Sequence, residues 1–136
     1  MKILIIHGPN MNLFGLRSAK SNQNITLDKI NKHIRKYVRN LKLEIKIIQT
    51  HNEDKVDSYL NRNRTKFDGL ILTPGVWQKS AYILNDTIEL INLPYYIIKL
   101  DQTETSSIFN TQLSIYEKNI YKAFEVALNN FLNVNE

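Results

Sequence analysis

Short apolar segments alternate with longer segments of helical period along this 136-residue chain, and this alternation is what most restricts its fold. Residues 2–6, 43–48, 67–73 and 95–100 are runs of strand length, rich in Ile, Leu and Tyr. Between these runs, apolar side chains recur every three or four residues, as they do in amphipathic helices. Strands that alternate with helices predict a parallel sheet that is covered by helices on both faces.

The predicted elements fit one domain over residues 1–136, an α/β fold with four or five parallel strands between two helical layers. Helices are predicted over residues 27–40, with Thr26 as N-cap, and over 53–63, 80–91 and about 120–131. A short fifth strand is predicted within residues 112–117. Adjacent Tyr95 and Tyr96 are predicted to face opposite sides of their strand. At this length the pattern suits the flavodoxin-like, doubly wound architecture.

Charge and composition exclude several classes of function. The net charge is +5, but five of the basic residues recur on one side of the first long helix, where we expect a solvated face. No aromatic side chains interleave with them, so a nucleic-acid partner is not expected. Without cysteine, and with three scattered histidines, the chain is expected to hold no metal and no disulfide. It has no apolar run of membrane-spanning length, and we expect a cytoplasmic protein. The five basic residues are Lys29, Lys32, Arg35, Lys36 and Arg39.

The loop after the first strand carries polar groups suited to a ligand. Gly8-Pro9 ends the strand, and Asn10, Asn12 and Arg17 follow. Ligands of open α/β sheets bind at the carboxyl ends of the strands, and arginine offers a planar fork to carboxylate or phosphate. The alternative is an ordinary turn with solvated side chains. The polar residues 18–24 are predicted to form a mobile loop, a candidate lid over the same edge.

Several segments resemble the type II 3-dehydroquinate dehydratases, the small flavodoxin-like enzymes of the shikimate pathway. Residues 8–17, Gly-Pro-Asn-Met-Asn-Leu-Phe-Gly-Leu-Arg, match the family pattern G-P-N-L-N-L-L-G-x-R. The resemblance continues in Thr26-Leu27-Asp28, in residues 67–75 and in Leu84-Asn85-Asp86, and it covers nearly the whole chain.

This resemblance implies a mechanism without a metal or an organic cofactor. In the family a loop tyrosinate, helped by an arginine, removes a proton alpha to the substrate ketone. An asparagine and an ordered water hold the enolate, and a histidine oriented by a glutamate protonates the departing hydroxyl. Backbone amides after the fourth strand hold the substrate carboxylate. The family forms trimers packed into dodecamers, with a side chain at the Asp86 position reaching the neighbouring site.

Much of that apparatus is replaced in this chain. Asn10 and Arg17 match the family, but the tyrosine expected five residues after the arginine is Asn22. Asparagine has no titratable group and cannot accept the proton. The histidine that acts as acid is replaced by Lys99. The remaining replacements are Thr73 for an asparagine, Lys79 for a histidine, Ile97 for the glutamate, Asp101-Gln102 for a serine and asparagine, and Ser106 and Asn110 for two arginines.

The leading hypothesis is therefore a dehydratase homologue with weak or no activity, whose basic side chains hold another small anion. Asp101 would place a negative charge beside the amides that receive a carboxylate. The first alternative is a working dehydratase that uses Lys99 as acid. The second is a non-catalytic oligomeric scaffold or binding module. The candidate catalytic residues are Arg17 and Lys99, and the candidate substrate-binding residues are Asn10, Asn12, Thr73, Lys79, Leu100, Asp101 and Asp86.

Overall fold

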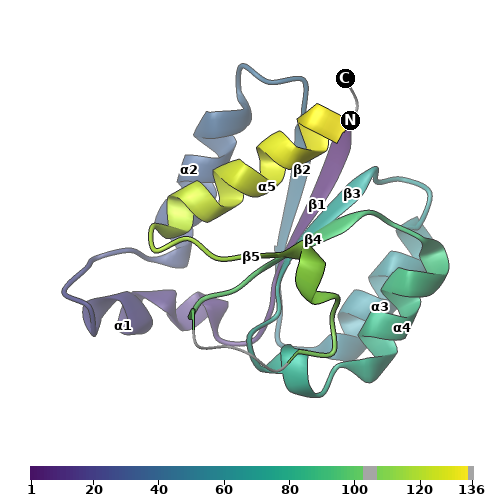
Figure 1. Ribbon diagram of the computed structural model, residues 1–136, viewed down its shortest axis with the longest axis horizontal. Helices are drawn as coiled ribbons and strands as arrows, with labels where there is room; N and C mark the ends of the chain where they lie inside the picture. The colour runs from purple at the N-terminus through teal and green to yellow at the C-terminus, as the bar shows by residue number, and fades with distance from the viewer. Residues whose placement is uncertain (103–106, 135–136) are drawn as a thin grey trace.

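The computed structural model describes residues 1–102 and 107–134, whose strands form a single five-stranded sheet between helices (Figure 1). The strands are β1 (Lys2–His7), β2 (Glu44–Gln49), β3 (Gly69–Thr73), β4 (Tyr95–Ile98) and β5 (Ser114–Ile115). The α-helices are α1 (Phe14–Ala19), α2 (Leu27–Val38), α3 (Glu53–Asn63), α4 (Tyr82–Ile91) and α5 (Ile120–Val134). Short 3-10 turns form η1 (Met11–Leu13), η2 (Gly75–Lys79) and η3 (Thr111–Leu113).

The sheet is parallel throughout, in the order β2-β1-β3-β4-β5, which confirms the doubly wound α/β prediction. The chain starts at the centre, runs out to β2, and returns past β1 to β3, β4 and β5. The point where the order reverses lies between β1 and β3, and the carboxyl ends of these strands are where ligands of such folds bind. The predicted fifth strand is present but short, since β5 pairs only with Ile97 and Ile98.

The two faces of the sheet build two separate hydrophobic cores. Side chains alternate along each strand, so Ile3 and Ile5 join the core under α2 and α5, while Leu4 and Ile6 join the core under α3 and α4. Figure 1 shows the same division, with α2 beside α5 and α3 beside α4. Burial on both faces explains why the central strands read as continuous apolar runs.

The helices begin where their capping residues stand. The Thr26 hydroxyl accepts from the Lys29 amide at the start of α2, and the Asn52 side chain accepts from the Lys55 amide at the start of α3.

Tyr95 lies in one core and Tyr96 against the other, which confirms that they face opposite sides.

Gly69 opens β3 at a point where no side chain fits. A Cβ atom placed there would lie 2.4 Å from the Phe131 ring, which α5 presses against the strand. A glycine is therefore required for α5 to close over the sheet at this position.

The prediction of an unstructured loop up to residue 24 is wrong in part. η1 and α1 occupy residues 11–19, and Ser18 is buried although it lies in a polar stretch. Its hydroxyl accepts from the Ile25 amide at 3.0 Å and lies 2.9 Å from the Ile25 carbonyl oxygen, so it ties the end of α1 to the approach of α2. The hydrogen bonds of a single serine fix this segment, and the spacing of apolar residues in the sequence could not predict them.

In the part of the chain that the structure describes, no helix is both long and apolar enough to span a lipid bilayer.

Candidate functional site

The loops that follow β1 and β3 are held together at the carboxyl edge of the sheet. The Gly8 amide donates to the Thr73 carbonyl oxygen at 2.9 Å. A Cβ atom at Gly8 would lie 2.8 Å from that oxygen and 3.0 Å from the Trp77 ring. Gly75, at φ 54°, approaches the Pro9 carbonyl oxygen in the same way. Both glycines are therefore needed for the loops to approach this closely.

His7, the last residue of β1, forms the polar centre beneath these loops. Its ring is fully buried, with Nε2 2.9 Å from Asn31 Oδ1 on α2 and Nδ1 3.1 Å from Thr73 Oγ1 on β3. A neutral ring protonated on Nε2 donates to the Asn31 oxygen, and the one proton of the Thr73 hydroxyl is then shared between Nδ1 and the Ile6 carbonyl oxygen, which lies 3.3 Å from Oγ1. The edge of the Phe124 ring closes the remaining side.

Burial decides the charge of this histidine. Desolvation lowers the pKa of His7 to about 4, although the Asn31 hydrogen bond opposes the shift. The ring is therefore uncharged at neutral pH and serves as a clamp between β1, β3 and α2. The sequence analysis missed this role, although a polar residue that ends a buried apolar strand was a visible signal.

Thr73 belongs to this clamp in the structure. Its side chain is fully buried and its hydroxyl contacts His7. The predicted contact with a substrate stays a prediction.

Asn10 and Asn12 lie on the exposed side of the first loop. Asn10 adopts a left-handed backbone, φ 68°, and caps η1 without a side-chain hydrogen bond. Asparagine tolerates this conformation better than most residues, so the turn itself explains part of its presence. Its amide side chain is exposed at the carboxyl end of β1.

Arg17 projects into solvent from α1, one residue before the buried Ser18. The chain then turns, and Asn22 adopts a left-handed backbone at φ 56° while its amide donates to the Ala19 carbonyl oxygen. The position where the family carries tyrosine is thus a tight turn that suits asparagine.

The other candidates come from three elements. Lys79 ends η2 and is exposed; Lys99 follows β4, half-buried, with its amide donating to the Ile115 carbonyl oxygen at 2.9 Å. Leu100 is half-buried and Asp101 is exposed. Because β1, β3 and β4 are parallel neighbours, the segments that follow them share one edge of the sheet. Asp86 lies apart, exposed on α4. Ser106, an arginine position in the family, lies outside the described residues.

The edge is partly covered by buried aromatic and polar groups. Trp77 is only 5% exposed and packs in the core against Gly8. The amide of Ile108 donates to the Gln78 carbonyl oxygen at 2.8 Å, so the chain returns over η2 after leaving β4. Within residues 1–102 and 107–134, no three His, Asp or Glu side chains gather as metal ligands.

Comparison with known proteins identifies the family of this chain. The sequence profile of the family described as dehydroquinase class II matches residues 1–124. A 3-dehydroquinate dehydratase of Geotalea daltonii is 30% identical over 112 residues, which are 82% of this chain and 78% of that protein. One of Halothermothrix orenii is 33% identical over 93 residues, 68% of this chain and 63% of that protein. The match thus spans under two thirds of the second relative's length.

Solved structures agree on the fold. A type II dehydroquinase from Butyrivibrio crossotus superposes with a TM-score of 0.84 at 20% identity, covering 95% of each chain. A 3-dehydroquinate dehydratase-like protein from Bifidobacterium longum gives 0.75 at 19% identity, covering 100% of this chain and 98% of the other. At these identities the likeness concerns architecture, and the chemistry has to be argued from the side chains.

Proposed function

The chain belongs to the class II dehydroquinase family, and from that premise we propose a divergent member that binds a small anion and dehydrates 3-dehydroquinate weakly or not at all. The observation that carries the proposal is Asn22. It stands where the family places its tyrosine base, in a turn whose left-handed backbone favours asparagine. A carboxamide accepts no proton near neutral pH, so the first step of the reaction lacks its base.

The acid step is weakened at the same edge of the sheet. Lys99 stands in place of the histidine, and Ile97, which is fully buried, replaces the glutamate that would orient it. An apolar side chain cannot hold a proton donor in place. We therefore assign the basic groups Arg17, Lys79 and Lys99 to anion binding.

Charge substitution at the loop after β4 tests anion binding. Asp101→Asn is expected to tighten binding of 3-dehydroquinate about fivefold, because it removes a like charge worth about 1 kcal/mol at an exposed position. Lys99→Ala is expected to weaken binding by a similar factor. Isothermal titration, or NMR shifts of the amides at residues 8–10 and 99–101, measures both.

The matched control is Lys36→Ala, at an exposed position in the last turn of α2, which should leave the affinity unchanged. Equal effects of Lys36→Ala and Lys99→Ala would mean that net charge alone attracts the anion. An affinity that is unchanged in Asp101→Asn would mean that the loop after β4 is not part of the binding site.

We also propose that the protein is a cytoplasmic homo-oligomer, either a trimer or a dodecamer built from four trimers. Four apolar side chains on η2 and α4 are 62–77% exposed: Val76, Tyr82, Ile83 and Leu90. On a helix, residues 82, 83, 86 and 90 share one face, so Asp86 lies among the three apolar side chains of α4. An exposed apolar group of this kind favours association, and it would bring Asp86 against a neighbouring chain.

Light scattering after size exclusion tests the oligomer. The native protein is expected to have the mass of three or twelve 15.9 kDa chains, and Leu90→Glu is expected to shift it toward the single chain. Leu16→Glu serves as control and should keep the native mass, since Leu16 is also an exposed leucine but lies on α1. A monomeric native protein would contradict the proposal.

A further inference from the structure

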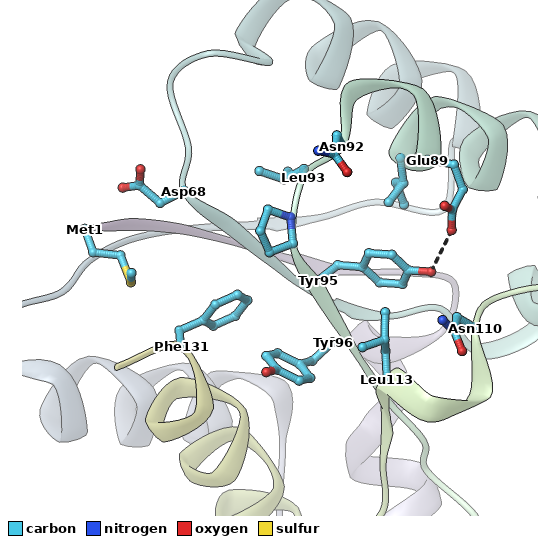
Figure 2. Close-up of a pocket in the computed structure, with 12 residues that line it drawn as sticks. Met1, Asp68, Glu89, Asn92, Leu93, Tyr95, Tyr96, Asn110, Leu113 and Phe131 are labelled. Carbon is cyan, nitrogen blue, oxygen red and sulfur yellow. Dashed lines mark hydrogen bonds between the residues drawn. The ribbon is translucent and has the colours of Figure 1, made fainter. Parts of the chain in front are cut away.

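A cavity of about 730 Å³ lies at the other end of the sheet, away from the loops after β1 and β3. Figure 2 shows it beside Tyr95 and Tyr96, at the start of β4. The cavity exists because β5 is short: its pairing begins opposite Ile97, so it does not reach the first two residues of β4. η3 turns the chain aside just before β5, and the Leu113 amide donates to the Asn110 carbonyl oxygen.

Aromatic rings form the walls of this cavity. Tyr95 approaches from the α4 side of the sheet, and Tyr96 and Phe131 from the α5 side. The Tyr96 and Phe131 rings meet edge to face, 4.9 Å between centroids at 75°. The volume is in the range that small-molecule sites occupy.

The polar side chains at the rim are acidic or neutral, while Met1, whose α-amino group is cationic, lines the end opposite Glu89. The Tyr95 hydroxyl donates to Glu89 Oε1 at 3.1 Å, with Asn110 beside it (Figure 2). Met1 and Asp68 lie at the opposite end of the cavity, where Asp68 accepts from the Lys2 amide. Of the residues that the structure describes, no Lys, Arg or His side chain lines the space. The Lys2 ammonium lies over the Phe67 ring, outside the lining.

Two further observations define the Glu89 end. The pKa of Tyr95 is raised, chiefly by burial and also by Glu89, so the phenol stays protonated and keeps donating to the carboxylate. The Glu89 side chain is exposed, and the Tyr95 hydroxyl is its one side-chain partner within the described part of the chain. A carboxylate beside electron-rich rings, with no neighbouring cation, complements a positive charge.

We propose that this cavity binds a small organic cation, an alkylammonium with an apolar or aromatic body. The ammonium group contacts the Glu89 carboxylate, and the body lies between Tyr95, Tyr96 and Phe131. The ligand proposed here is a cation, whereas the ligand proposed for the carboxyl edge of the sheet is an anion. Neither proposal depends on the other, so an experiment can refute one and leave the other intact.

Titration with three probes of similar shape tests the charge preference. Phenethylammonium is expected to bind saturably and to shift the NMR amide signals of Tyr95, Tyr96 and Phe131. 2-Phenylethanol, its neutral counterpart, is expected to bind about three- to thirtyfold more weakly, the combined range for an exposed ion pair and a cation–π contact. The anion 3-phenylpropanoate is expected to leave these signals unmoved. Equal binding of the amine and the alcohol would overturn the proposal, as would the absence of shifts at these residues.

A substitution at Glu89 tests whether its carboxylate binds the ammonium group. Glu89→Gln keeps an oxygen that accepts from Tyr95 and is expected to lower phenethylammonium affinity two- to about fivefold, the part supplied by the exposed ion pair, while the cation–π contact remains. Asp28→Asn, an exposed carboxylate on α2, is the matched control and should leave the affinity unchanged. If both variants bind like the native protein, the proposal is wrong. The comparison of the three probes on the native protein stands even where a variant folds poorly.

Discussion

Purified protein is expected to dehydrate 3-dehydroquinate at least about 10⁴-fold more slowly than a relative that carries the tyrosine base and the histidine acid. Positioned general acid or base groups contribute about 10²–10⁴-fold each, and this chain has Asn22 and Lys99 at their positions. Asn10 and Arg17 match the family pattern, but a carboxamide and a guanidinium that stays protonated do not supply the missing proton transfers.

The ultraviolet absorbance of the conjugated enone product measures this directly. A family member with the full catalytic set, at the same concentration, is the positive control. Turnover within tenfold of that control would contradict the proposed function. Lys99→Ala would then decide the alternative: loss of turnover would identify Lys99 as the acid, and unchanged turnover would exclude it.

Lowering the pH from 7 to 5 is expected to reduce the free energy of unfolding by about 2 kcal/mol through His7 alone. The pKa of His7 is about 4 in the fold, against 6.5 when unfolded. The unfolded chain therefore binds the proton first, and stability that is full above pH 6.5 is lost as the pH falls toward 4. The described neighbours of the ring, Asn31, Thr73 and Phe124, are uncharged and offer the imidazolium no compensation.

Urea unfolding of the native protein and His7→Gln across this range tests the assignment. The glutamine variant starts less stable, because it loses part of the clamp, but its stability should depend less on pH by about 2 kcal/mol. His51→Gln, at an exposed position, is the control and should keep the native slope. Parallel curves for the native protein and His7→Gln would contradict a buried neutral histidine.

The fold could be predicted from the sequence because its strongest signals are local. Both faces of the central strands are buried, so residues 3–6 and 70–72 read as unbroken apolar runs. The helix Glu53–Asn63 was predicted at its observed bounds. The position of β2 at an edge was visible in the alternation of residues 43–46. The strand that was hardest to predict was β5, because only two of its residues pair and so short a strand shows almost no sequence pattern.

The conformation of the site could not be predicted from the sequence, because it is fixed by individual polar contacts. Ser18 is buried by hydrogen bonds to the backbone of Ile25, which no periodicity announces. The His7 clamp joins residues 24 and 66 positions apart in the chain. The cavity beside Tyr95 depends on where β5 begins, which is a matter of tertiary packing.

The backbone at Asn22 also bears on what a tyrosine engineered at this position would cost. The left-handed geometry would strain the new residue by about 1 kcal/mol. The Ser18 hydroxyl, which bonds the backbone of Ile25, holds the segment in its present course. The folded protein can tolerate a strain of this size, so the turn disfavours an aromatic side chain at residue 22 without excluding it.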